Sequence, residues 1–174
     1  FFVINFNISA EELNITASEI DILNDNKLII AKGSVKIIDS DGNIVETDKA
    51  EYDKTIEQVT TYENSKIILI NGYEISSSKI VYDNKNKFIF SNNRSYLKDS
   101  DENHVTVNMF EYQIKKFLFS SRGEIKIKDK NNNKYYFSEM YIDTKNRKIV
   151  GSEVRVSMDK KAVGLSDEND PRFV

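Results

Sequence analysis

The side chains that most often do chemistry in proteins are scarce in this chain. Among its 174 residues there is no cysteine and no tryptophan, and His104 is the single histidine. The missing thiols exclude disulfides, zinc–thiolate sites and cysteine nucleophiles. One histidine excludes a multi-histidine metal site and leaves little for acid–base catalysis. We therefore expect no catalytic residue, no metal site and no cofactor, and the sequence does not predict an enzyme.

Two acidic stretches are the remaining candidates for chemistry. Residues 39–41 and 99–101 both read Asp-Ser-Asp. Neither is followed by the ligand spacing and the terminal glutamate of an EF-hand loop, so both are interpreted as turns. His104 lies just beyond the second stretch and is interpreted as a solvated loop residue.

The charge balance excludes one class of partner. Lys+Arg 25 against Asp+Glu 28 gives a net charge of −3. A protein that binds nucleic acid through phosphate contacts needs a basic face, so we expect no nucleic-acid partner. No stretch reaches the ~20 apolar residues that a transmembrane helix requires.

Apolar residues recur every thirty residues, and this repeat predicts the elements of the fold. Laid out in five rows of thirty, several columns are apolar in every row. A fixed period of this length is typical of stacked repeat architectures. Two such columns are Ile15, Val45, Ile75, Val105, Tyr135 and Ile29, Val59, Ile89, Phe119, Ile149.

Each row reads as two strands separated by a polar turn. Apolar residues alternate with polar ones, which is typical of strands with one buried face. The alternation slips by one residue inside each row, which predicts a bulge or bend at the same level of successive strands. The predicted fold is all-β: about ten antiparallel strands from five 30-residue hairpin repeats, in an open, elongated, jelly-roll-like sandwich. A closed barrel is the alternative.

The inward-facing columns are the candidate binding surface. They line an apolar groove or form an ordinary sandwich core, and the tyrosines among them favour partial exposure because a buried hydroxyl needs a partner. The candidate groove residues are Ile29, Ala50, Tyr52, Val59, Ile80, Tyr82, Ile89, Phe110, Tyr112, Phe119 and Ile149.

The two ends of the chain depart from the repeat. Residues 1–10 (FFVINFNISA) resemble the end of a secretory signal peptide, with a first β-strand over residues 1–6 as the alternative. Residues 11–163 are the predicted β domain. Residues 164–174 lose all alternation and are interpreted as a linker to a further region.

The repeated rows resemble the OstA-like domains of the lipopolysaccharide transport family. Residues 15–18 (ITAS) and 31–37 (AKGSVKI) carry the fullest match, and the pairs at 52–53 and 82–83 repeat a central Tyr-Asp. The resemblance covers roughly residues 12–163. Within the family it is fullest for the N-terminal periplasmic domain of the LPS-assembly protein, because residues 169–172 (NDPR) match the linker there. The periplasmic bridge protein is second.

The resemblance implies a function that needs no catalytic group. It implies that a hydrophobic groove binds lipopolysaccharide through its lipid A acyl chains and passes it toward the outer membrane. It implies a periplasmic module, attached to the outer membrane in the full-length protein, with neighbouring OstA-like domains joined by edge-strand pairing. An outer-membrane barrel and a lipoprotein partner follow if the chain is part of the LPS-assembly protein.

Two other functions were weighed against this one. A protein–protein scaffold module without a lipid groove is the alternative. A glycan-binding sandwich or lyase is disfavoured, because the chain has no tryptophan and no clustered catalytic carboxylates.

Overall fold

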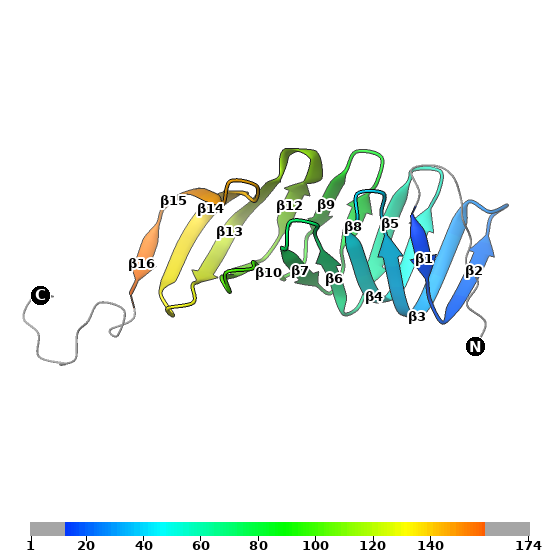
Figure 1. Cartoon of the computed structure of the whole chain (residues 1–174), viewed down its shortest axis with the longest axis horizontal. Helices are drawn as coiled ribbons and strands as arrows, with labels where there is room; N and C mark the ends of the chain where they lie inside the picture. Colours follow the sequence, from blue (N-terminus) through cyan, green and yellow to red (C-terminus); the bar gives the residue numbers. More distant parts are fainter. Residues whose placement is uncertain (1–12, 159–174) are drawn as a thin grey trace, which may run out of the picture.

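The computed structural model describes residues 13–158. The predicted signal segment (residues 1–10) and linker (residues 164–174) lie outside this range and are not tested by it. The described part is an elongated stack of strands that run across the long axis, with β2 at one end and β16 at the other (Figure 1). All strand pairs are antiparallel, so the predicted all-β class is confirmed.

The stack contains sixteen strands and one short helical turn. Within residues 13–158, no helix has the length and apolar content that crossing a lipid bilayer requires. In chain order the elements are β1 (Asn14–Thr16), β2 (Glu19–Leu23), β3 (Leu28–Ile38), β4 (Ile44–Asp53), β5 (Gln58–Tyr62), β6 (Ser65–Ile68), β7 (Glu74–Ser77), β8 (Val81–Asp83), β9 (Phe88–Ser91), β10 (Ser95–Lys98), β11 (His104–Val107), β12 (Phe110–Gln113), the 3-10 turn η1 (Ile114–Lys116), β13 (Leu118–Lys128), β14 (Lys134–Asp143), β15 (Lys148–Ser152) and β16 (Arg155–Ser157).

The sixteen strands lie at ten successive positions across the sheet, here called strand rows, because a bend divides most of these positions into two strands. β3, β4, β13 and β14 run through the bend as single strands, and β3 and β13 shift register there. The other six rows are broken into two strands each, which explains why the sequence predicts about ten. Left-handed backbone marks the bend at positions that lie thirty residues, or a multiple of thirty, apart: Gly33, Glu63, Gly123 and Glu153.

Small hydroxyl side chains satisfy the backbone along this bend. The Ser91 hydroxyl donates to the Lys79 carbonyl oxygen at 2.6 Å, and the Ser121 hydroxyl donates to the Met109 carbonyl oxygen at 2.7 Å. Both serines are buried. A bend interrupts the backbone ladder, and a buried carbonyl without a partner is costly, so these hydroxyls stabilise the interrupted strands.

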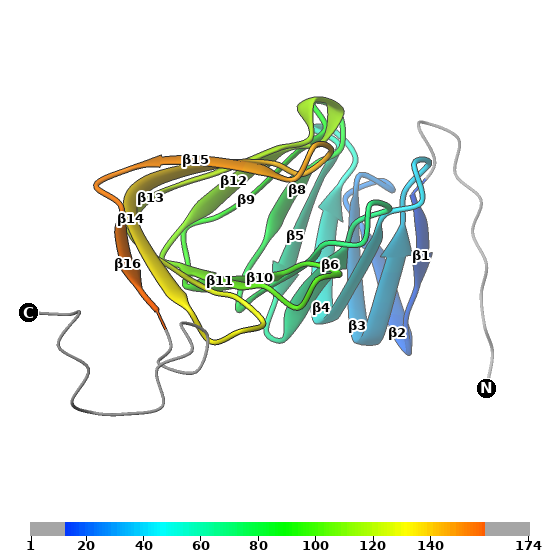
Figure 2. The same cartoon turned by 60° about the vertical axis from the view of Figure 1, so that its left-hand side comes forward.

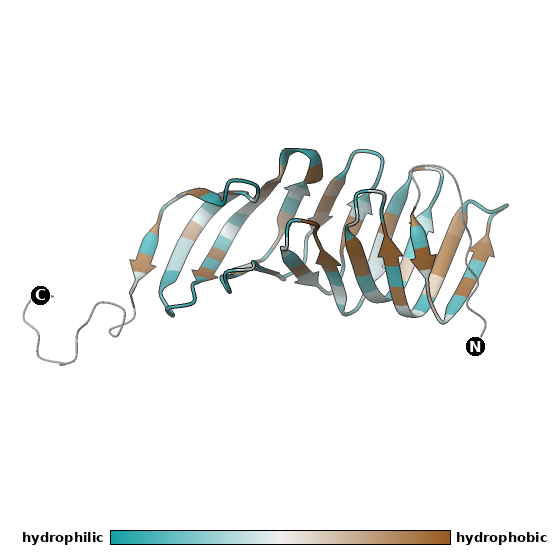
Figure 3. Cartoon of the chain, viewed as in Figure 1, coloured by the Kyte–Doolittle hydropathy of each residue, from teal (hydrophilic) through white to brown (hydrophobic). Residues whose placement is uncertain are grey.

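The bend folds one 16-stranded sheet into two facing layers (Figure 2). Layer A contains β2, β5, β8, β9, β12 and β15, with residues 28–32, 49–53, 118–122 and 139–143 of the long strands. Layer B contains β1, β6, β7, β10, β11 and β16, with the other halves of those strands. Apolar and polar residues alternate along the strands, which leaves one face of each layer for the interior (Figure 3).

Register places the apolar columns side by side in both layers. In layer A a continuous line of paired side chains crosses ten strands. Its residues are Ile22, Ile29, Tyr52, Val59, Tyr82, Ile89, Tyr112, Phe119, Ile142 and Ile149. In layer B the facing line of paired side chains consists of Ile15, Ile37, Val45, Ile67, Ile75, Leu97, Val105, Ile127, Tyr135 and Val156.

The stack is not closed into a barrel within the described residues. β1 and β2 pair only with β3, and β15 and β16 pair only with β14. The two ends of the sheet therefore remain unpaired edges, as an open sandwich requires.

Candidate functional site

The turns of layer B are built from one repeated hydrogen-bond pattern. Asp39 accepts from the Asn43 backbone N–H through Oδ1 (2.8 Å) and from the Asn43 amide through Oδ2 (2.8 Å). The pairs Asp99–Asn103 and Asp129–Asn133 repeat the same bonds. These carboxylates are occupied by their own turns, which is a common use of aspartate in a turn. Residues 13–158 hold no group of three Asp, Glu, His or Cys side chains arranged to bind a metal ion.

One turn of layer B breaks this pattern. Leu69 stands where the other turns have aspartate, and Tyr73 stands where they have asparagine. The backbone bonds of the turn remain, with the Leu69 N–H donating to the Tyr73 carbonyl oxygen at 2.8 Å. Both side chains are buried, so this turn contributes apolar surface to the interior in place of a polar pair.

Polar contacts join the two layers along the side opposite the bend, which we call the mouth. The Tyr82 hydroxyl in layer A donates to Asp39 Oδ2 in a layer B turn at 2.7 Å. Next along the mouth, the Asn71 amide of layer B donates to Thr144 Oγ1 of layer A at 3.0 Å. Because these contacts tie the turns of one layer to the other, the middle of the mouth is closed.

A third contact closes the mouth nearer the C-terminal end. The Arg147 guanidinium of a layer A turn contacts Asp101 Oδ2 at 2.5 Å and donates to Ser100 Oγ at 2.6 Å. The Arg147 and Asp101 side chains are each 52% exposed. A pair this exposed gains little from its charge, so it is the weakest of the three contacts.

Beneath the Arg147–Asp101 pair lies a cavity of about 440 Å³ between the layers. Layer A contributes Ile142 and Ile149, and layer B contributes the apolar faces of β10, β11, β13 and β14. Aspartates of the neighbouring turns lie at its rim. The lining residues are Tyr73, Leu97, Asp99, Asp101, Asn103, Val105, Ile127, Asp129, Tyr135, Phe137, Ile142, Arg147 and Ile149.

Gly151 is needed where β15 passes Phe137, one of the cavity residues. A Cβ added at Gly151 would lie 2.6 Å from the Glu139 carbonyl oxygen and would also clash with the Phe137 ring. Real Cβ atoms do not approach this closely, so any side chain at this position would displace the ring or the backbone of β14.

The electrostatics of the cavity rim follow from hydrogen bonds and burial. Partial burial works to raise the pKa of Asp129, but hydrogen bonds from Asn133 and from the Tyr135 hydroxyl outweigh it and hold that pKa below its usual range. Burial, reinforced by the charge of Asp99, raises the pKa of the Tyr73 hydroxyl. At neutral pH the rim therefore carries a charged aspartate beside neutral tyrosines.

The candidate groove residues fall into two groups. Ten of them are buried in the packed interior, and their exposed fractions run from 0% to 9%. Ile149 alone lines the cavity and is 48% exposed. The buried residues are Ile29, Ala50, Tyr52, Val59, Ile80, Tyr82, Ile89, Phe110, Tyr112 and Phe119.

Most cavity residues were not among those candidates, although their columns had been recognised. Val105 and Tyr135 belong to the same apolar column as Ile75, but that column lies in layer B, and the candidates were drawn mainly from layer A. The departure at Leu69 and Tyr73 from the polar turn pattern was the one signal in the sequence that could have pointed to the cavity. Phe137 carries no such signal.

Apolar side chains are also exposed at both ends of the stack. Ile22 and Leu23 are exposed at the β2 edge. The β15–β16 end exposes more, namely Ile149, Val150, Val154, Val156 and Met158.

Similarity to known proteins is found among solved structures and not among family models or curated proteins. No model of a known protein family matches the sequence, and no curated protein matches it. One solved structure similar to the chain is the crystal structure of LptH, described as the LptA homologous periplasmic component of the conserved lipopolysaccharide transport device from Pseudomonas aeruginosa. The match covers 84% of this chain and 94% of that chain, with 12% sequence identity and a TM-score of 0.35. A likeness at this level bears on neither the family nor the function of this chain.

Proposed function

We propose that this chain is an OstA-like module that carries lipopolysaccharide through the periplasm toward the outer membrane, with acyl chains shielded between its two layers. The observation that carries the proposal is the apolar cavity of about 440 Å³ at the C-terminal end of the interior. The repeated row pattern of residues 12–163, which resembles that family, supports it.

The cavity suits part of an amphiphile better than a whole polar molecule. Its volume lies within the ~300–1,000 Å³ typical of small-molecule sites. Its walls are mostly apolar, with polar groups gathered at the rim. Each methylene group removed from water contributes about 0.8 kcal/mol, so an acyl chain enters such a space favourably while its headgroup stays outside. Transport of this kind breaks no bond and requires no catalytic group.

Photo-crosslinking to purified lipopolysaccharide tests the proposal. A benzophenone amino acid at Phe137 or Ile149 faces the cavity, and we expect it to label lipopolysaccharide. The matched control is the same probe at Tyr96, which is 52% exposed and lies on the outer face of layer B, away from the cavity. Equal labelling from Tyr96 and the cavity positions would refute shielding inside the sandwich.

Edge pairing with neighbouring OstA-like domains belongs to the same proposal. β15 and β16 leave one side unpaired and expose Val154 and Val156, which favours addition of another strand. The outer-membrane barrel and lipoprotein partner, and attachment to the outer membrane, follow only for the LPS-assembly protein. The double substitution Val154→Lys and Val156→Lys is expected to weaken association with a neighbouring domain, measured by analytical ultracentrifugation, while lipopolysaccharide crosslinking from Phe137 persists.

A protein–protein scaffold without a lipid groove is the second candidate. The packed central interior favours it, since Val59, Ile67 and Ile75 have no exposed surface. The crosslinking experiment separates the two functions. A scaffold associates through its edges and gives no lipopolysaccharide labelling from Phe137 or Ile149.

A further inference from the structure

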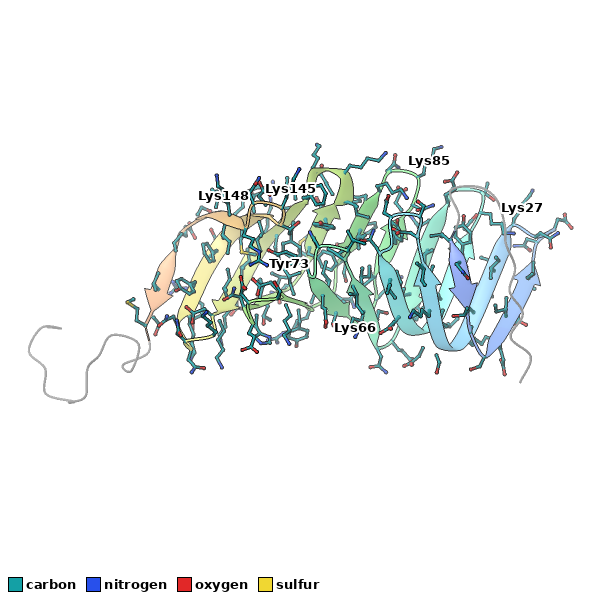
Figure 4. The ribbon with its side chains drawn as sticks, viewed as in Figure 1. Lys27, Lys66, Tyr73, Lys85, Lys145 and Lys148 are labelled. Carbon is teal, nitrogen blue, oxygen red and sulfur yellow. The ribbon has the colours of Figure 1, made fainter. Side chains whose placement is uncertain are left out.

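Toward the C-terminal end, the two rims of the mouth carry opposite charge. The five turns of layer A, two strands and so about 10 Å apart, each carry a lysine: Lys27, Lys54, Lys85, Lys115 and Lys145. Figure 4 shows Lys27, Lys85, Lys145 and Lys148 along one long edge of the molecule. Three turns of layer B carry aspartates, at positions 39, 41, 99, 101 and 129, beside Lys130, whereas the turn at residues 69–73 carries no charged side chain.

The carboxylates at the cavity end accept hydrogen bonds from their own turns, and Lys145 lies over the Phe117 ring, with its Nζ 5.6 Å from the ring centroid. Asp99 and Asp129 accept hydrogen bonds from their own turns through both oxygens. On the opposite rim, Asp143 accepts from the Asn146 backbone and side chain. Within residues 13–158, Lys145 and Lys148 form no ion pair. The layer A side of the cavity entrance therefore carries the positive charge of Lys145 and Lys148, opposite the carboxylates of layer B.

Arg147 stands between the cavity and this positive rim. Its guanidinium lines the cavity and reaches across the mouth to Asp101 and Ser100. Guanidinium groups bind phosphate in the same bidentate manner as carboxylate. An exposed ion pair is worth little, so an anion held close by an acyl chain in the cavity competes effectively for Arg147.

We propose that the cavity end is a two-part site for an amphiphile with a phosphate headgroup, in which the phosphate displaces Asp101 from Arg147 as the chain enters. In the absence of ligand, the Arg147–Asp101 ion pair spans the entrance of the cavity. Lys145 and Lys148 add positive charge beside the displaced pair. This inference rests on the proposed function for its acyl-chain subsite and adds the chemistry of the headgroup and the residue that receives it.

Calorimetric titration with three amphiphiles of equal chain length tests the inference on the full chain. The probes are monomeric dodecyl phosphate, dodecyl maltoside and dodecyltrimethylammonium. We expect dodecyl phosphate to bind about tenfold more tightly than dodecyl maltoside, as one added charge-assisted contact predicts. The trimethylammonium probe is expected to bind most weakly.

Two variants of the Arg147–Asp101 pair are expected to change the affinity for dodecyl phosphate in opposite directions. Arg147→Gln is expected to remove the preference for dodecyl phosphate. Asp101→Asn releases Arg147 and is expected to raise dodecyl phosphate affinity about threefold or more, because the competing charge is lost. Dodecyl maltoside enters the same apolar space without a charged headgroup, so the preference for phosphate is measured in each variant as the ratio of the two affinities.

Arg122→Gln is the matched control. Arg122 is also an exposed arginine paired with a carboxylate, Glu139, but it lies on the outer face of layer A. An equal loss of dodecyl phosphate affinity in Arg122→Gln and Arg147→Gln would reduce the effect to overall charge and overturn the inference. Unchanged affinity in Asp101→Asn would overturn it as well.

Two further results separate the possible failures. Inorganic phosphate alone is expected not to bind at the concentrations used, and binding as tight as dodecyl phosphate would indicate a free-anion site instead. If dodecyl phosphate and dodecyl maltoside bind equally in every variant, the headgroup inference fails and the acyl-chain site stands. If no amphiphile binds the unmodified chain, the proposed function fails with it.

Discussion

The middle of the stack and its C-terminal end are built from the same rows but have different interiors. In the middle, Ile75 and Val59 have no exposed surface, and the Phe110 and Phe119 rings stack at 5.5 Å. At the C-terminal end, residues of the same columns surround a cavity, and Ile149 is half exposed.

The difference shows that one repeat pattern is compatible with either a packed core or an open space. In both regions the inward residues are apolar and in register. Tyr82 and Asn71 tie the layers together over the middle, whereas the exposed Arg147 side chain crosses the cavity end to Asp101 and Ser100. The packing between the layers, and not the apolar pattern of the repeats, decides which region can accept a ligand.

The largest expected contrast is in the cost of removing an inward isoleucine. Ile75→Ala leaves a void in the packed middle and is expected to lower the free energy of unfolding by about 3 kcal/mol. Ile149→Ala is expected to cost about 1 kcal/mol or less, because its side chain is already half in water. Urea denaturation measures both. Similar losses for the two variants would show that the cavity end is packed as tightly as the middle.

A smaller contrast is expected between two tyrosine hydroxyls that bond equivalent aspartates. Tyr82 donates to Asp39 in the buried middle at 2.7 Å, and Tyr135 donates to Asp129 at the cavity rim at 3.0 Å. Tyr82→Phe is expected to cost about 1–2 kcal/mol, because it removes a buried bond that joins the layers. Tyr135→Phe, at a partly exposed bond within one layer, is expected to cost less than about 1 kcal/mol. Equal unfolding midpoints in urea would contradict a tighter mouth over the middle.

The smallest expected effect is the response of the cavity rim to acid. The pKa of Asp129 is lower in the folded chain than in the unfolded chain, so its contribution to stability is present above the unfolded value and is lost as pH falls through the folded value. We expect the amide signals of Asn131 and Asn133, which donate to Asp129, to titrate with a midpoint below about 3.9. NMR at successive pH values measures this.

Asp129→Asn supplies the control for the acid response. Without the carboxylate, the same two amide signals should not titrate in this range, and the loss of stability on acidification should be shallower. A midpoint at or above the usual aspartate value in the unmodified chain would mean that the Asn133 bonds do not outweigh burial at this rim.

Much of the fold could be predicted from the sequence, because its cause is local and repeated. Alternation gave the strands, and the slip in phase gave the bend, which the structure places at residues such as Gly33 and Gly123. The number of strands differed only because the bend divides six rows. The candidate site was predicted less well: Ile149 lines the cavity, whereas Tyr82 and Phe119 lie in the packed middle.

By itself, the sequence determined which residues face inward, because side chains of a strand alternate between faces and register keeps every apolar column in line. Only the tertiary structure decided where the interior is filled and where it is open. That depends on how the two layers pack against each other, which involves contacts between residues far apart in the chain, such as Asp39 with Tyr82 and Asp101 with Arg147. Periodicity within a strand carries no information about such contacts.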